Sequence, residues 1–367
     1  MKNCIKSFSR FHSGGFSLLF KKSQVREKMP EERDIYSNYL REKEDIDYTF
    51  RPKSLNDFIG QNRIIENMRV YITAARQRGE SIDHVIFSGP PGLGKTTLAF
   101  VTASEMGVEY HYTSAPALEK KGDLAAILTK MKDKDVLFID EIHRLRPELE
   151  EILYSAMEDF HVNIVMGQGI SANSITIPIP RFTLIGATTR TGLLTRPLLS
   201  RFGIDMKLEL YSIEDIIRII FRSVQYMQIA IDKAAAQEIA LRSRGTPRIA
   251  NRLLRRIRDF AQVHGTGSID KDVTDLAFRE LDIDESGLTH TDRKLLEFIL
   301  SSCRGGPVGV ETIAVSIGET SETIEDVVEP YLIQQGYIVR TQRGRCITKK
   351  VYDLFGKSVP DYQQFLF

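Results

Sequence analysis

The sequence contains only three cysteines, and their positions exclude a fold built on disulfides. Cys4, Cys303 and Cys346 are scattered along the chain, odd in number and outside any CxxC pattern. A disulfide framework needs pairs of cysteines, and a structural zinc site needs closely spaced ones. The sequence indicates neither of them and fits the reducing cytosol. We therefore expect a cytoplasmic protein.

The sequence also lacks a charge excess and a long hydrophobic run. Fifty basic and 49 acidic side chains leave a net charge of +1, so composition alone gives no argument for nucleic-acid or membrane binding. No apolar run approaches the roughly 20 residues of a membrane-spanning helix. The 367 residues, 42% hydrophobic and 27% charged, are typical of a globular protein with two or three domains.

The first 26 residues lack acidic side chains but contain six basic ones. A transit peptide has this composition, but we favour a disordered basic leader, or an upstream start codon with Met29 as the usual one. A secretory signal is excluded because its hydrophobic segment, "FSLLF", is too short. We interpret residues 1–45 as a flexible leader.

Strand and helix patterns alternate over residues 46–211, which predicts an α/β domain with a parallel sheet. Buried strands are expected at 83–89, 134–140 and 181–189, where short β-branched runs occur. The segment 162–180 interrupts this alternation with two alternating runs around a glycine pair, which predicts an inserted β-hairpin.

Strand patterns disappear after residue 211, and the last two predicted domains are mostly helical. Amphipathic helices with glycine stops predict a small all-helical domain over 212–285. Three helices and a hairpin turning at Arg343-Gly344 predict a winged helix over 286–350. Residues 351–367 are interpreted as a C-terminal tail.

A phosphate-binding loop is predicted by "GPPGLGKT" (89–96), which fits GxxxxGK[ST] between a strand and a helix. Its glycines let backbone N–H groups curl around phosphate oxygens. Lys95 is expected to reach the β- and γ-phosphates of ATP, and Thr96 to ligate Mg²⁺.

Two acidic residues follow a later strand, in "VLFIDEIH" (136–143). Ligand sites of α/β sheets form at such strand ends, so Asp140 is expected to hold the Mg²⁺ and Glu141 to activate the attacking water. The second acid favours an NTP hydrolase over a small-molecule kinase. A third strand ends in hydroxyls at "IGATT" (185–189), which either sense the γ-phosphate or cap the next helix.

Basic residues outside this domain suggest phosphate partners. Arg248 lies in the first turn of a helix, where its charge opposes the helix dipole, and a phosphate would offset that cost. The segment 337–350 contains five basic residues and no acid. It is either a DNA-backbone contact or a solvated basic turn.

These segments together resemble the AAA+ ATPases with a winged-helix tail and, more narrowly, the RuvB family of Holliday-junction branch-migration motors. The resemblance spans about residues 46–350 in order. It rests on "RPKSLNDFIGQ" (51–61), "GPPGLGKTTLA" (89–99), "VLFIDEIHRL" (136–145), "AMEDF" (156–160), "FTLIGATTR" (182–190), "GTPRIANRLLRRIRDFA" (245–261), "DRKLL" (292–296), "GGPVG" (305–309), "EDVVEPYLIQQG" (325–336) and "RTQRGR" (340–345).

The resemblance implies a hexameric ring that draws duplex DNA through itself with ATP hydrolysis, beside a junction-binding partner (RuvA) and a possible junction resolvase. It implies that the hairpin 162–180 docks on that partner. The implied nucleotide and Mg²⁺ contacts of the chain's own site are Phe50, Arg51, Gly92, Gly94, Lys95, Thr96, Thr97, Asp140, Glu141, Thr189, Tyr211 and Arg248.

Further implied site residues are Glu158, Asp159 and Phe160 near a nucleotide, Arg201 as the arginine finger for a neighbour's ATP, and Arg340 and Arg345, beside Arg343, on DNA. Members of the family usually have the sequence L-R-D-R-F-G where this chain has L-L-S-R-F-G (198–203). Leu199 and Ser200 therefore replace a charged pair, and an arginine at 196 replaces a common small residue. We expect these changes to alter the subunit interface.

Three other classes of protein share some of these sequence features. A clamp-loader subunit has the same loop and finger but ends in a helical collar. A superfamily-2 helicase needs a second RecA-like domain, which the mostly helical remainder cannot supply. A nucleotide-switched DNA-binding or assembly protein would not need Glu141.

Overall fold

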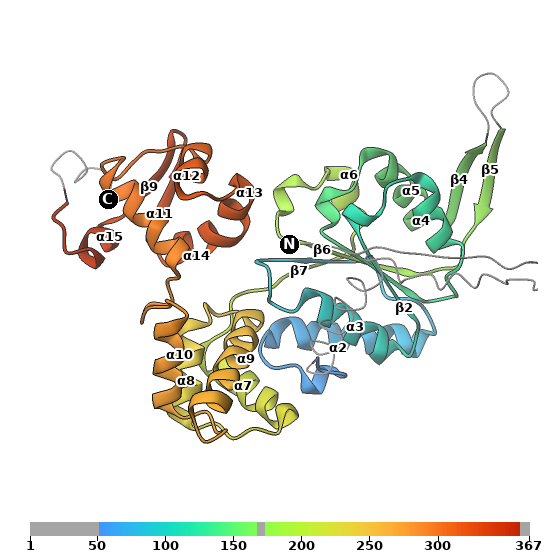
Figure 1. Cartoon of the computed structure of the whole chain (residues 1–367). Helices are drawn as coiled ribbons and strands as arrows, with labels where there is room; N and C mark the ends of the chain where they lie inside the picture. The colour runs from blue at the N-terminus through green and yellow to red at the C-terminus, as the bar shows by residue number, and fades with distance from the viewer. Residues whose placement is uncertain (1–50, 167–172, 360–367) are drawn as a thin grey trace, which may run out of the picture. The chain divides into compact units, whose positions relative to one another are not determined.

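The computed structural model describes residues 51–166 and 173–359 (Figure 1). The expected leader, Phe50 and the tip of the inserted hairpin lie outside the described residues.

The sheet of the first domain has five parallel strands in the order β2-β3-β6-β1-β7. The predicted parallel sheet is confirmed. The sequence analysis missed β2 and β7, the two edge strands, because β2 is half-exposed and contains a histidine, and β7 is short and exposes every second residue. The strand bounds are β1 Val85–Ser88, β2 Tyr110–Ser114, β3 Val136–Asp140, β6 Thr183–Thr188 and β7 Ile204–Lys207.

Helices cover both faces of this sheet (Figure 1). Side chains alternate along each strand, so Val85 and Phe87 enter one core while Ile86 enters the other. The first core contains α2 (Asn62–Arg78) and α3 (Lys95–Met106), and the second contains α4 (Lys121–Leu128), α5 (Pro147–Glu158) and α6 (Arg196–Leu199). Short 3₁₀ turns lie at Leu55–Asp57, Ala115–Ala117, Ile142–Arg144 and Thr191–Leu193.

The predicted inserted hairpin is confirmed as a separate antiparallel pair (Figure 1). Its strands are β4 (His161–Met166) and β5 (Asn173–Pro178). They are paired with each other from His161–Pro178 to Met166–Asn173, and no described strand of the main sheet pairs with them.

Four helices form the second domain: α7 (Ile213–Met227), α8 (Lys233–Arg242), α9 (Pro247–His264) and α10 (Lys271–Glu280). The predicted all-helical character is confirmed, although α10 was not predicted. Ser212, Asp232 and Asp270 cap the starts of α7, α8 and α10 with their side chains. The apolar faces of these helices belong to the same core as α2 and α3.

The last domain has the predicted winged-helix order of three helical segments and a hairpin. They are α11 (His290–Ser301), α12 (Val310–Ile317), α13 (Ser321–Thr323) continuing through a π turn (Ile324–Val328) into α14 (Glu329–Gln334), β8 (Ile338–Thr341) and β9 (Gly344–Ile347). A further helix, α15 (Lys349–Leu354), contributes buried Val351 and Tyr352 to this core. The domain therefore extends past residue 350. Among the described residues no helix is long and apolar enough to cross a membrane.

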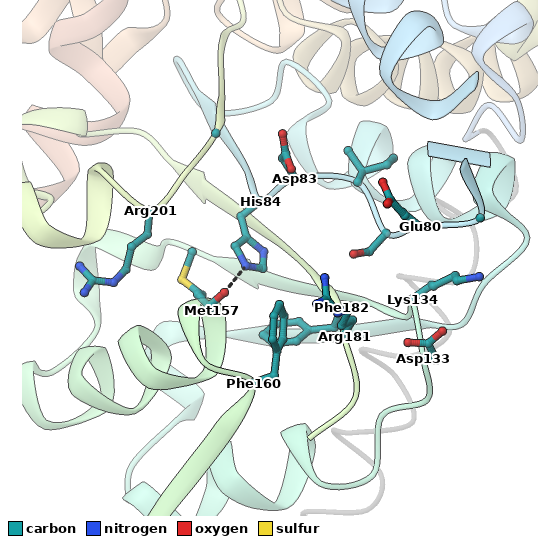
Figure 2. A pocket seen from close by; sticks show the side chains of 14 residues that line it. Glu80, Asp83, His84, Asp133, Lys134, Met157, Phe160, Arg181, Phe182 and Arg201 are labelled. Atoms are coloured by element: carbon teal, nitrogen blue, oxygen red, sulfur yellow. Dashed lines mark hydrogen bonds between the residues drawn. The ribbon is translucent and has the colours of Figure 1, made fainter. Parts of the chain in front are cut away.

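A half-buried imidazole connects β6 to the end of α5. His84, just before β1, accepts a hydrogen bond at Nδ1 from the Leu184 backbone N–H (2.8 Å), so its Nε2 carries the proton and faces the Met157 carbonyl at 3.3 Å (Figure 2). Burial lowers the pKa of His84 below its ordinary value of 6.5, opposed by the contact with Met157 and by Asp83.

We expect this imidazole to make stability fall as the pH drops. The unfolded chain takes up its proton near pH 6.5, whereas the folded imidazole resists protonation until a lower pH, so acid favours unfolding. In His84→Gln the free energy of unfolding should depend less on pH between about 7.5 and about 5.5, measured by urea unfolding. Identical pH dependence in both proteins would refute this role of His84.

Candidate functional site

The loop between β1 and α3 has the backbone shape that a phosphate requires. Gly89, Gly92 and Gly94 have φ angles of 136°, 82° and 98°, which side chains with a Cβ rarely adopt. The helix α3 begins directly afterwards at Lys95, with Thr96 and Thr97 in its first turn. Free N–H groups and the helix dipole make this position an anion site.

Lys95 is the centre of the site's charges. Its Nζ donates to the carbonyls of Gly89 (2.7 Å) and Pro90 (2.9 Å), and the residue is only 7% exposed. Burial lowers the pKa of Lys95 to about 8, while Asp140 and Glu141 raise it and Arg248 lowers it further. The structure thus brings together four charged residues that the sequence analysis predicted for one site.

The acidic pair at the end of β3 is held in a fixed geometry. Asp140 accepts a hydrogen bond from the Glu141 backbone N–H at 3.0 Å, and Glu141 has a left-handed backbone with φ of 50°. Thr189 Oγ1 lies 3.4 Å from Glu141 Oε2. The hydroxyl that follows β6 therefore contacts the residue expected to activate water.

Two further residues around Glu141 were not predicted. His143 Nδ1 lies 3.3 Å from Glu141 Oε2 and 3.0 Å from Thr188 Oγ1. Burial lowers the pKa of His143, and the Glu141 carboxylate opposes that effect. The imidazole therefore stands as a hydrogen-bonding group between the acid and β6. The only sequence signals were the final letter of "DEIH" and the hydroxyl before Thr189.

The helical domain supplies the other wall of the loop. Tyr211, buried, donates its hydroxyl to the Leu93 carbonyl at 3.0 Å. Arg248 approaches Gly92 so closely that a Cβ on the glycine would lie 2.9 Å from the Arg248 Cβ. Tyr211 and Arg248 therefore join the predicted site, and Arg51, half-buried, precedes it in the chain.

Arg201, Glu158, Asp159 and Phe160 do not join this chain's phosphate loop. Arg201 stands just before β7 begins, at the amino edge of the sheet, whereas the phosphate loop follows the carboxyl end of β1. The four residues of β1 separate the two edges by about 13 Å. Glu158 instead forms an ion pair with Arg201 at 3.0 Å.

A polar cavity of about 750 Å³ opens at this amino edge (Figure 2). Its walls come from the segments just before β1, β3 and β6, from the end of α5, and from Arg201. Charges of both signs line it, among them Asp83, Lys134 and Arg181. The cavity is therefore distinct from the phosphate site. It lies at the amino edge of the sheet, next to Arg201.

The basic hairpin of the winged helix is partly neutralised within its own domain. Arg345, 9% exposed, forms ion pairs with Glu329 and with Glu325, and Arg340 Nη2 lies 2.6 Å from Glu329. Arg343, at the exposed turn between β8 and β9, has no side-chain ion pair among the described residues. Arg343 is thus the hairpin arginine whose charge is most available to a phosphate backbone.

Three family models match successive parts of the chain. Residues 50–208 match the Holliday junction DNA helicase RuvB P-loop domain, residues 211–284 the RuvB AAA lid domain, and residues 285–356 the RuvB C-terminal winged helix domain. The chain belongs to the RuvB family.

Solved structures of this family match most of the chain. The Holliday junction branch migration motor RuvB of Thermotoga maritima has 48% sequence identity and a TM-score of 0.77, covering 85% of this chain and 100% of its own. A mutant of the same protein matches with a TM-score of 0.78 at 48% identity, covering 84% and 100% of the two chains.

Membership in the RuvB family makes this chain a nucleotide-binding, ATP-hydrolysing DNA motor that acts in Holliday-junction branch migration. The family's winged helix also distinguishes it from a clamp-loader subunit with a helical collar. The superfamily-2 alternative fails because an all-helical lid and a winged helix follow the single α/β domain.

Gly92 provides a test of the contact between the loop and the lid. We expect Gly92→Ala to weaken nucleotide binding by about tenfold or more, because the new methyl group would clash with Arg248 at a backbone angle that disfavours alanine. The matched control is Gly122→Ala on the exposed face of α4, where an added Cβ meets nothing within 4 Å. Titration with a fluorescent nucleotide measures both, and equal affinities would contradict the clash.

Proposed function

We propose that ATP is bound with Mg²⁺ and that the chain's own residues divide the work of hydrolysis. Thr96 and Asp140 offer the hydroxyl and carboxylate oxygens that Mg²⁺ prefers, and the ion would neutralise charge on the β- and γ-phosphates. Lys95 and the loop N–H groups hold those phosphates. Glu141 takes the proton of the attacking water, and Thr189 orients the water from β6.

Phe50 and Arg51 are assigned to the adenine and ribose in this proposal, and Gly92, Gly94 and Thr97 to the phosphate chain. Tyr211 and Arg248 close the site from the lid. Arg248 packs against Gly92 of the loop and is close enough to lower the pKa of Lys95, which supports its assignment to the same chain's γ-phosphate.

We further propose that Arg201 completes the ATP site of a neighbouring subunit. This proposal rests on the position of Arg201 at the amino edge of the sheet. The length of β1, about 13 Å, separates that edge from the chain's own phosphate loop. Glu158, Asp159 and Phe160 share that edge and are assigned to the same neighbouring site, Glu158 through its ion pair with Arg201. A chain that offers its loop to one neighbour and Arg201 to the other makes head-to-tail contacts, which either close into a ring or continue as a filament. A closed homohexamer is the assembly we propose.

The DNA-facing part of the proposal rests on the winged helix and the β4–β5 hairpin. Arg343 is proposed to contact the phosphate backbone first. Arg340 and Arg345 would do so by exchanging Glu325 and Glu329 for phosphates. The hairpin is proposed to dock on a RuvA-like junction-binding protein, with a junction resolvase as a further partner. The proposed location is the cytoplasm.

A nucleotide-switched DNA-binding protein is the alternative of a different class. Glu141, held by Thr189 and next to His143, argues against it because a switch has no need to activate water. Normal ATP turnover by Glu141→Gln, with DNA binding that still follows the nucleotide state, would favour the switch.

Mixing two inactive variants tests the shared site. Arg201→Ala subunits keep an intact phosphate loop, and Lys95→Ala subunits keep an intact Arg201. We expect each variant alone to lose about 10³-fold or more of the ATPase rate. The mixture should recover a substantial part of it, because some interfaces then combine both intact halves.

The matched control is a mixture of Arg201→Ala with the double variant Arg201→Ala/Lys95→Ala, in which no interface is complete. Recovery in the first mixture and none in the control supports action between subunits. Absence of recovery in the first mixture, in assemblies of the same size as the wild type, contradicts it.

A further inference from the structure

The guanidinium of Arg201 is held against one face of α5. Its Cζ lies 4.3 Å from the centre of the Tyr154 ring, and its Nη2 lies 3.0 Å from Glu158 Oε2. Its Nη1 donates to the Pro197 carbonyl at 2.7 Å. The side chain is only 19% exposed, and its buried Nε has no hydrogen-bond partner in the described part of the chain.

The segment that carries Arg201 is anchored at its other end to the same helix face. Glu150, Tyr154 and Glu158 are four residues apart on α5 and so lie in one row. Thr195, which caps α6, donates to Glu150 Oε2 at 2.7 Å, and the Tyr154 hydroxyl donates to the same oxygen at 2.7 Å. One row of α5 therefore fixes both the start of α6 and the arginine after its end.

The segment itself offers Arg201 a carbonyl, that of Pro197, but no carboxylate. Residues 195–203, "TRPLLSRFG", contain no acidic side chain. Leu198 is buried, Leu199 packs against the same core, and Ser200 donates to the Pro197 carbonyl. With Leu199 and Ser200 next to it, Arg201 has its carboxylate partner on another element, and α5 supplies it through Glu158.

We propose that Tyr154 and Glu158 form a positioning platform for the trans-acting Arg201, an inference that rests on the proposed function. The Tyr154 ring fixes the plane of the guanidinium, and Glu158 occupies the place that a neighbour's phosphate takes over. Tyr154 and Glu158 are positioning residues, because they act on the reaction only through Arg201.

The two halves of the platform differ in strength. Glu158 is more than half exposed, so its ion pair is weak and can be exchanged for a phosphate, which carries more charge. The ring contact lies at a partly buried site and does not compete with a phosphate, because the ring covers one face of the guanidinium while its N–H groups point outward in the plane. Holding the arginine in advance lowers the entropy cost of reaching the neighbour's nucleotide.

The mixed ATPase assay separates this role from a general structural one. The finger donor is Lys95→Ala and the site acceptor is Arg201→Ala. We place Tyr154→Leu either in the donor or in the acceptor. In the donor it should lower the recovered kcat by about 5- to 30-fold, the range expected for a lost cation–π contact. The KM for ATP should change less than about twofold, because the acceptor's own loop binds the nucleotide.

Placed in the acceptor, Tyr154→Leu should change the recovered rate by less than about twofold, because that subunit has no Arg201 to position. In the donor, Tyr154→Phe keeps the ring and should retain the rate within about threefold. Glu158→Gln in the donor should lower the rate less than Tyr154→Leu does, since the lost ion pair is exposed. Melting temperatures and assembly size of all variants are measured alongside.

Equal losses from Tyr154→Leu in donor and acceptor would overturn the platform while leaving the shared site intact. A Tyr154→Phe loss as large as that of Tyr154→Leu would overturn the role of the ring face. A loss of that size from Glu158→Gln would overturn the exchange with phosphate. Failure of the unmodified donor and acceptor to recover any activity would instead contradict the proposed function itself.

Discussion

The parallel sheet keeps the carboxyl ends of its strands one strand length away from the amino ends, and the rest of this molecule depends on that separation. All five strands run the same way, so every strand's carboxyl end meets one edge and every amino end the other. The phosphate loop, Asp140, Glu141 and Thr189 gather at the first edge, while Arg201 and Glu158 stand at the second. In the shared site that we propose, each edge supplies one half, and a single chain completes neither.

In each half of the proposed site, contacts with neighbouring elements hold the functional side chains in place. At the loop edge, the lid holds Arg248 against Gly92, and His143 braces Glu141 through contacts that reach Thr188 on β6. At the finger edge, one row of α5 holds both Thr195 and Arg201. Fixed dipoles and charges of this kind cost no reorganisation when the reaction occurs.

Much of this could be read from the sequence, because the loop's glycines, Lys95 and the acids after β3 are a local pattern with a local cause. The edge strands β2 and β7 were missed since their short, half-exposed runs lack the apolar signal of a buried strand. The partners of Arg345 and of Arg201 could not be predicted. Glu329 and Glu158 are distant in the chain from the arginines they pair with, and only folding brings them together. The role of His143 could not be predicted either, because only the fold places its imidazole beside Glu141 and Thr188.

The central claim is that junction movement requires a finger from the neighbouring subunit, and dissociation of a synthetic four-way DNA junction tests it most directly. With ATP and a junction-binding partner, the wild type should separate the junction into duplexes. Arg201→Ala should bind nucleotide equally well yet separate junctions at least about 10³-fold more slowly. Junction separation by Arg201→Ala at the wild-type rate, or none by the wild type with or without the partner, would contradict the account.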